Sequence, residues 1–202
     1  MKNTKKLVAL LLALCLVLGG IIGGTLAYLM TETDPVTNTF VAGKIGTLTL
    51  TESDDDKKFM VIPGVDIKKD PTVTFSGNNV AAYVFVKVEQ NGWQVSEDGM
   101  TYSCVGGKVT WTISAEWTHL GKGVYYREVA ADTDTANIAE TEKYGIIAGN
   151  TITVPNTVTK GDLAAFTEGT SLIFTAYAVQ QDTFAGAKAA WNATFGQTNP
   201  LA

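Results

Sequence analysis

The chain of 202 residues contains a single histidine, His119, on which any histidine-dependent catalysis would have to rest. A zinc protease of the usual kind needs a His-Glu-x-x-His pattern, and that pattern does not occur. A Ser-His-Asp triad or a Cys-His dyad would also have to use His119. Because Leu120 and Gly121 follow it, His119 is expected to end a strand before a glycine turn, as a solvated histidine. The sequence therefore predicts a protein that is not an enzyme.

Two acidic clusters, Asp54–Asp56 and Asp132–Asp134, are the candidates for binding a hard cation. An EF-hand loop that begins at Asp132 would need glycine at 137 and glutamate at 143, where this chain has Asn137 and Lys143. Solvated carboxylates are the simpler interpretation of both clusters, and calcium binding stays open. No glycine-rich phosphate loop occurs, so no cofactor is predicted. Carboxylate pairs for glycoside hydrolysis stay open, because their separation is spatial.

The first 27 residues have the layout of a secretory signal peptide. Three lysines precede an apolar run from residue 7 to residue 22, and small residues lead to Ala27. Cleavage between Ala27 and Tyr28 would release a secreted chain that touches the membrane only through its signal peptide. A retained membrane anchor is the alternative, because the apolar run approaches the length that spans a bilayer.

Composition restricts the class of partner. The chain has 15 Lys and Arg against 20 Asp and Glu, and loss of the three N-terminal lysines changes the net charge from −5 to −8. Such an acidic chain lacks the basic surface that nucleic acid requires. Cys104 would be the sole thiol of the released chain, which excludes an intramolecular disulfide. We expect Cys104 to be a small apolar residue in a strand.

Strand patterns dominate from Phe40 to Gln180. From Val109 to Trp117, apolar and polar residues alternate, which predicts a strand with one buried face. Two nearly continuous apolar runs, Ala81–Val88 and Leu172–Val179, predict central strands that are covered on both faces. Turn residues separate six further candidate strands, namely Thr39–Leu50, Phe59–Ile62, Thr72–Phe75, Met100–Val105, Val124–Val129 and Gly145–Val154.

These roughly nine strands predict an all-β fold, specifically a jelly-roll-like β-sandwich with one or two short helices. The sandwich would form a single domain over residues 28–202. One helix would begin at Thr159 or Asp162 and continue through Phe166. The other would be capped by Asp182 and would pack its aromatic residues against the sheets.

Several segments, spread over most of the chain in the expected order, resemble the TasA/camelysin family of secreted bacterial proteins. They are Gly23–Tyr28, Asn38–Lys44, Pro63-Gly64, Lys69–Val73, Ala82–Val86 and Ala176–Gln180 with Ala190-Trp191. The first segment is similar to the signals that the specialised signal peptidase SipW processes. This similarity implies cleavage between Ala27 and Tyr28.

The resemblance implies a jelly-roll subunit of biofilm fibres in the extracellular matrix or at the surface of a Gram-positive bacterium. Its partners would be copies of itself or related matrix subunits. In such fibres the freed N-terminal segment of one subunit completes the sheet of the next. Here that donor segment would be residues 28–50, with Asn38, Phe40, Val41 and Gly43 as the candidate donor residues. A head-to-tail interface that does not close produces a filament.

Three alternatives stay open. Residues 28–50 could form an ordinary first strand of their own sandwich, because edge strands are normally protected against pairing. The protein could be a monomeric surface-binding or adhesin-like module that uses Trp93, Tyr125 and Tyr126 as exposed loop aromatics. Because camelysin has been described as a metalloprotease, the resemblance also implies a secreted protease, although no recognisable catalytic motif supports it.

Overall fold

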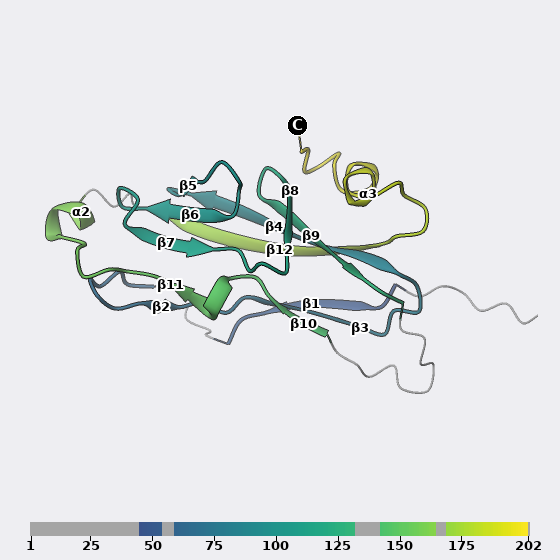
Figure 1. The fold of residues 1–202 in the computed structure, drawn as a ribbon, viewed down its shortest axis with the longest axis horizontal. Helices are drawn as coiled ribbons and strands as arrows, with labels where there is room; N and C mark the ends of the chain where they lie inside the picture. The colour runs from purple at the N-terminus through teal and green to yellow at the C-terminus, as the bar shows by residue number, and fades with distance from the viewer. Residues whose placement is uncertain (1–44, 54–58, 132–141, 165–168, 202) are drawn as a thin grey trace, which may run out of the picture. The chain divides into compact units, whose positions relative to one another are not determined.

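In the computed structural model of the chain, residues 45–53, 59–131, 142–164 and 169–201 are described (Figure 1). All of them belong to one compact unit, Ala42–Ala202. The expected signal peptide, both acidic clusters and the candidate donor residues 38, 40, 41 and 43 lie outside the described residues. Within the described ranges, no helix has the length and apolar character that crossing a membrane requires.

The described part is all-β, as predicted, with antiparallel pairing throughout its four sheets. The first sheet has the order β12 (Ser171–Gln180), β4 (Ala82–Asn91), β9 (Val124–Val129) and β8 (Thr118–Gly121). The second has the order β1 (Thr47–Thr51), β3 (Thr72–Ser76) and β10 (Glu142–Gly145). The two smaller sheets are β5 (Gln94–Val95), β6 (Thr101–Cys104) and β7 (Val109–Thr112), and β11 (Thr151–Ile152) with β2 (Ile67–Lys68).

The strands form two facing layers (Figure 1). The four-stranded sheet and the β5–β6–β7 sheet make one layer, and the β1–β3–β10 sheet with the β2–β11 pair makes the other. One main core joins them, because Val73 and Phe75 of β3 pack in the same cluster as Val84 and Val86 of β4 and Trp111 of β7. Burial of these apolar side chains between the layers is the main force that holds the sheets together.

β4 confirms the expectation of a central strand for Ala81–Val88. It lies between β12 and β9, and its residues Ala82–Val86 are all buried. Leu172–Val179 forms β12, which ends the strand order of its sheet among the described strands, so the expected central position is not found there. β12 is apolar on both faces because one face packs on the main core and part of the other lies under a helix. An edge strand can therefore carry the sequence pattern of a central one.

The strand predicted for Val109–Trp117 ends early. β7 stops at Thr112, Ile113 forms only an isolated bridge with Ile147, and a turn follows in which the Trp117 amide donates to the Ser114 carbonyl at 3.0 Å. The alternating pattern correctly predicts the burial of Ile113 and Trp117, but Ala115 is exposed in the turn.

The other candidate strands are found with changed limits. Within the described residues, Thr39–Leu50 contributes β1, and Gly145–Val154 divides between β10, a short 3-10 helix η1 (Ala148–Asn150) and β11. Phe59–Ile62 does not form a strand, because Ile62 bridges only to Val65 across a turn. The candidates around β3, β6 and β9 agree with the structure to within one residue at each end.

Two α-helices are present among the described residues, α2 (Lys160–Ala164) and α3 (Ala187–Thr194). Thr159 and Asp162 cap α2 reciprocally, since the Asp162 amide donates to Thr159 Oγ1 at 3.2 Å and the Thr159 amide donates to Asp162 Oδ2 at 2.7 Å. The first helix prediction is therefore confirmed at its N-terminus. The second is wrong at its N-terminus, because Gly186 and not Asp182 precedes α3.

Candidate functional site at an open sheet edge

The outer edge of β12 is the feature of this fold that is best suited to binding. β12 pairs with β4 along its whole length, from Ser171 opposite Asn91 to Gln180 opposite Ala82. On its other side no described strand is hydrogen-bonded to it, and β1, which lies beside it, pairs with β3 instead. A ten-residue strand presents about 30 Å of edge, on which unpaired N–H and C=O groups can bind a further strand.

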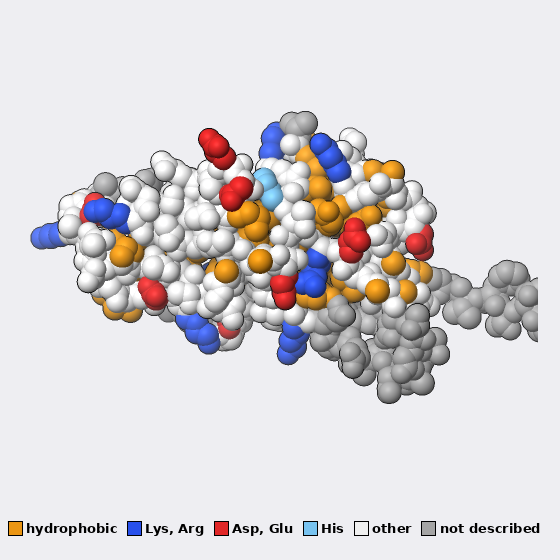
Figure 2. Space-filling view, in the orientation of Figure 1, with side chains coloured by type: hydrophobic (Ala, Val, Ile, Leu, Met, Phe, Trp, Pro, Cys, Tyr) orange, Lys and Arg blue, Asp and Glu red, His pale blue; other side chains and the backbone are white. Residues whose placement is uncertain are grey.

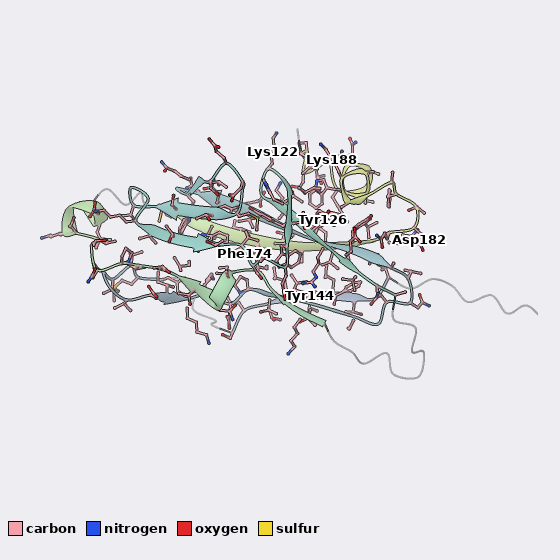
Figure 3. The ribbon with its side chains drawn as sticks, viewed as in Figure 1. Lys122, Tyr126, Tyr144, Phe174, Asp182 and Lys188 are labelled. Carbon is pink, nitrogen blue, oxygen red and sulfur yellow. The ribbon has the colours of Figure 1, made fainter. Side chains whose placement is uncertain are left out.

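The two faces of β12 have different surroundings. Phe174, labelled in Figure 3, lies between the layers and packs with Leu172 against the main core. On the opposite face, Tyr177 and Val179 pack into a second cluster around Trp191 of α3. Ile173 is 55% exposed, so the outward face is uncovered near the beginning of β12. The exposed Ile173 and the edge with which no described strand pairs therefore belong to the same strand.

A groove of about 330 Å³ opens where β12 begins. Its lining is mainly apolar and comes from both layers, with Phe59, Val61, Ile67, Val109, Ile152 and Leu172 among its walls. Ser171 and Thr170 also line it, so the groove continues directly from the open edge. An apolar side chain next to a strand added at this edge would find a largely preformed pocket there.

Two of the polar side chains that line this groove are Lys69 and Trp93, and Lys69 is paired with Glu52 behind the lining. Trp93 Nε1 and Glu52 Oε1 are buried and have no hydrogen-bond partner among the described residues. Lys69 lines the groove, with its Nζ 2.6 Å from Glu52 Oε2 and 4.4 Å from the centre of the Phe59 ring. An unsatisfied buried donor or acceptor is costly, and a peptide main chain supplies both an acceptor for an indole N–H and a donor for a carboxylate. Their placement favours an extended peptide as the ligand.

His119 lies near the end of β8, directly before the glycine turn as expected, and its side chain is partly buried rather than fully solvated. The centre of its ring lies 5.1 Å from the centre of the Tyr125 ring. The ring also packs against the backbone of Gly99, so closely that a Cβ atom on residue 99 would lie only 2.1 Å from His119 Cε1. The Ser96 hydroxyl donates to Asp98 at 2.5 Å. Since a triad needs a hydroxyl that is hydrogen-bonded to the histidine, Ser96, Asp98 and His119 do not form one.

Cys104 is buried in β6, as expected for a small apolar residue. Burial raises the pKa of its thiol to about 11, which opposes formation of the reactive thiolate. Among the described residues, no group of three or more His, Cys, Asp and Glu side chains is placed to hold a metal ion. The candidate calcium clusters at 54–56 and 132–134 lie outside those residues.

The aromatic residues of the monomeric binding alternative are only partly where it needs them. Tyr125 is 1% exposed, and its hydroxyl is hydrogen-bonded to the Tyr102 hydroxyl at 2.7 Å and donates to the Gly99 carbonyl. Trp93 and Tyr126 are half-buried, and Tyr126 belongs to β9. Figure 2 shows hydrophobic side chains reaching the surface around α3 and the β8–β9 hairpin. The prediction of three exposed loop aromatics is therefore wrong for Tyr125.

The sequence did not indicate the open edge or the groove, because both depend on which strands become neighbours. Ile173 was the one available signal, as an apolar residue on the outward face of β12, beyond the part that α3 covers. Neither a family model, nor a curated protein, nor a solved structure matches this chain. Inference about function therefore rests on the residues and on their arrangement.

Proposed function

We propose that this protein is a secreted structural subunit of extracellular matrix fibres, with a jelly-roll-like β-sandwich fold. A signal peptidase of the SipW type would cut between Ala27 and Tyr28 and free the N-terminal segment. That segment would then add a strand to the sheet of a neighbouring copy. The outer edge of β12, with which no described strand pairs, and the apolar groove beside it are the observation that carries this proposal.

The donated part would be residues 28–44. Thr47–Leu50, the last part of the candidate donor segment, pair with β3 of the same chain and are not free. The remaining 17 residues could span up to about 56 Å when extended, which exceeds the roughly 30 Å of edge that β12 offers. Phe40 and Val41 are adjacent apolar residues in this stretch, so one of them would face the core of the acceptor.

The register of the strands favours donation between copies over pairing within one chain. Thr47 pairs with Ser76, and the chain passes from Ser76 directly into β4 at Ala82, which lies opposite Gln180. β1 therefore begins at the end of the sheets where β12 finishes. A preceding segment that folded back along its own β12 would have to run parallel to it. A donated strand can run antiparallel, which is slightly more stable per residue.

Comparison of two purified chains tests the proposal. A chain that begins at Tyr28 should form filaments above a critical concentration, and a chain that begins at Gly46 should stay monomeric and folded. Electron microscopy and size-exclusion chromatography over a concentration series would measure both outcomes. In the chain that begins at Tyr28, Phe40→Lys together with Val41→Lys should make it behave like the truncated chain. Thr33→Ser, at a position that is not one of the candidate donor residues, is the matched control and should assemble.

Two other results would contradict the proposal. Filaments from the chain that begins at Gly46 would show that assembly does not use the N-terminal segment. If both chains stay monomeric and folded, a monomeric surface-binding module becomes the better explanation. Saturable binding of a carbohydrate or a protein by the monomer would then support that second function.

A further inference from the structure

An apolar turn projects beside the groove, and it takes no part in the main core. It consists of Met60, Ile62 and Val65, which are 77%, 45% and 53% exposed. Only three other large hydrophobic residues in the described part of the chain are comparably exposed. Scattered apolar residues on a surface need no explanation, but three within six positions indicate an interaction surface.

The apolar turn is held rigidly. The Val65 amide donates to the Ile62 carbonyl at 3.0 Å, and the Gly64 amide donates to the Val154 carbonyl at 3.1 Å. Pro63 and Gly64, with a φ of +77° at the glycine, suit the two central positions of a type II turn. Its exposed side chains are therefore presented on an ordered backbone, so a partner would lose little conformational entropy by binding them.

The apolar turn and the groove are continuous, because they share one segment. Phe59 and Val61 line the groove, while Met60 and Ile62 are exposed. An occupant of the groove that contacts Phe59 or Val61 therefore lies next to the apolar turn.

We infer that the apolar turn contacts the opposite end of a second copy of this chain, at Ile45 just before β1, so that it forms a second part of the head-to-tail interface. This inference rests on the proposed function. Ile45 is 36% exposed. It comes two residues before Thr47, the first residue of β1, and so lies at the end of the sheets where β1 begins. The apolar turn lies at the other end, beside the start of β12.

The direction of strand addition connects these two ends. β12 runs from the groove at Ser171 toward Gln180, so a donor strand that is antiparallel to it runs toward the groove. The last donor residues then leave the acceptor at the groove end, next to the apolar turn. Ile45 follows the donor segment immediately in the sequence, so it arrives at the same place. A parallel donor would bring Ile45 to the far end instead.

Assembly of chains that begin at Tyr28, which contain every described element, tests the inference. Replacing the apolar turn by Met60→Ser, Ile62→Ser and Val65→Ser should raise the critical concentration for filaments by about tenfold or more, because apolar contact is lost. Thermal unfolding of the monomer should change little, since these side chains are exposed. Val95→Ser, at another exposed apolar residue, is the matched control and should assemble normally.

Cross-linking tests the pairing itself. A chain carrying both I45C and V65C, treated with a short bis-maleimide linker, should give a ladder of covalent oligomers. Either substitution alone should give dimers at most. The buried Cys104 should not contribute, because its thiol is poorly accessible and little ionised.

The possible failures can be told apart. If the chain that begins at Tyr28 assembles and the serine variant assembles equally well, or if no ladder forms, the inference is overturned and the proposed function stands. If the unaltered chain does not assemble, both are overturned. If the serine variant loses binding to phosphatidylglycerol vesicles while its assembly is unchanged, the apolar turn is a lipid-binding surface and the inference is overturned.

Discussion

At the scale of single residues, Cys104 connects burial to reactivity. It is 6% exposed, and burial raises the pKa of its thiol to about 11. At pH 8 only about a thousandth of such a thiol is ionised, against roughly a fifth of an unperturbed one. In a chain that begins at Tyr28, where Cys104 is the sole thiol, iodoacetamide should therefore react at least about 100-fold more slowly with the native protein than with the unfolded protein.

Mass spectrometry over a urea series measures this directly. The labelling rate should rise together with the unfolding transition, and the same chain in high urea supplies the reference rate. Cys104 is one of the residues that line the groove. Rapid labelling of the native protein at pH 8 would therefore show that the groove admits the reagent and that the thiol is ionised there.

Residue types alone predicted the burial of Cys104 but not the packing of His119. Cys104 lies on the same buried face of β6 as Tyr102, so the alternation of residue types along this strand is consistent with its burial. His119 packs on Gly99, which belongs to a different hairpin, and on Tyr125 of the adjacent strand. When a side chain packs on a segment that is distant in the sequence, its environment cannot be predicted from the residues next to it in the chain.

At the scale of elements, the cap of α2 predicts a dependence of stability on pH. The Lys108 ammonium, 2.6 Å from Asp162 Oδ2, and then the hydrogen bonds from Thr159 hold the pKa of Asp162 well below its ordinary value of 3.8. A carboxyl whose pKa is lower in the folded state stabilises the fold above the unfolded pKa. This contribution is lost as the pH falls below about 4 toward the folded value.

Asp162→Asn should therefore lower the unfolding temperature at pH 7 and should have a clearly smaller effect near pH 2, where the contribution is partly lost. The exposed interaction is modest in size, so the readout is the change in pH dependence rather than one value. Asp182→Asn, at an exposed carboxylate outside α2, is the control for removing one negative charge. An equal loss of stability by Asp162→Asn at both pH values would contradict an ionic role.

Elements were predictable where their determinants are local. The cap of α2 lies within four residues, and the turn at Pro63-Gly64 within two, so the sequence contains all the groups involved. The edge position of β12 was not predictable, because α3 and the main core together give it apolar neighbours on both faces. The pattern of apolar residues indicates whether the two faces of a strand are covered. Whether the strand lies at an edge depends instead on its neighbours in the plane of the sheet, along the direction of the hydrogen bonds.

At the scale of the whole molecule, composition and strand pattern were sufficient to predict the all-β class. The candidate site was not predictable, because the groove joins residues from Phe59 to Leu172 through the packing of two layers. Strand registers also decide which end of the sheets receives β1 and which end holds the groove. Because β1 begins at one end of the sheets and the groove lies at the other, a head-to-tail arrangement of copies is geometrically consistent. This placement of the two features depends on the folded chain and could not be predicted from the sequence.

Hydrogen exchange should show where assembly occurs. Along an antiparallel edge strand, every second amide points away from its partner, so about half of the β12 amides have no partner strand among the described residues. If a donated strand binds there, the exchange of those amides should slow by at least about tenfold in filaments. β4 pairs on both sides already and should change little, which provides an internal control. Slowed exchange at β8 instead would place the contact on the opposite edge of the sheet, because β8 ends the strand order that begins at β12.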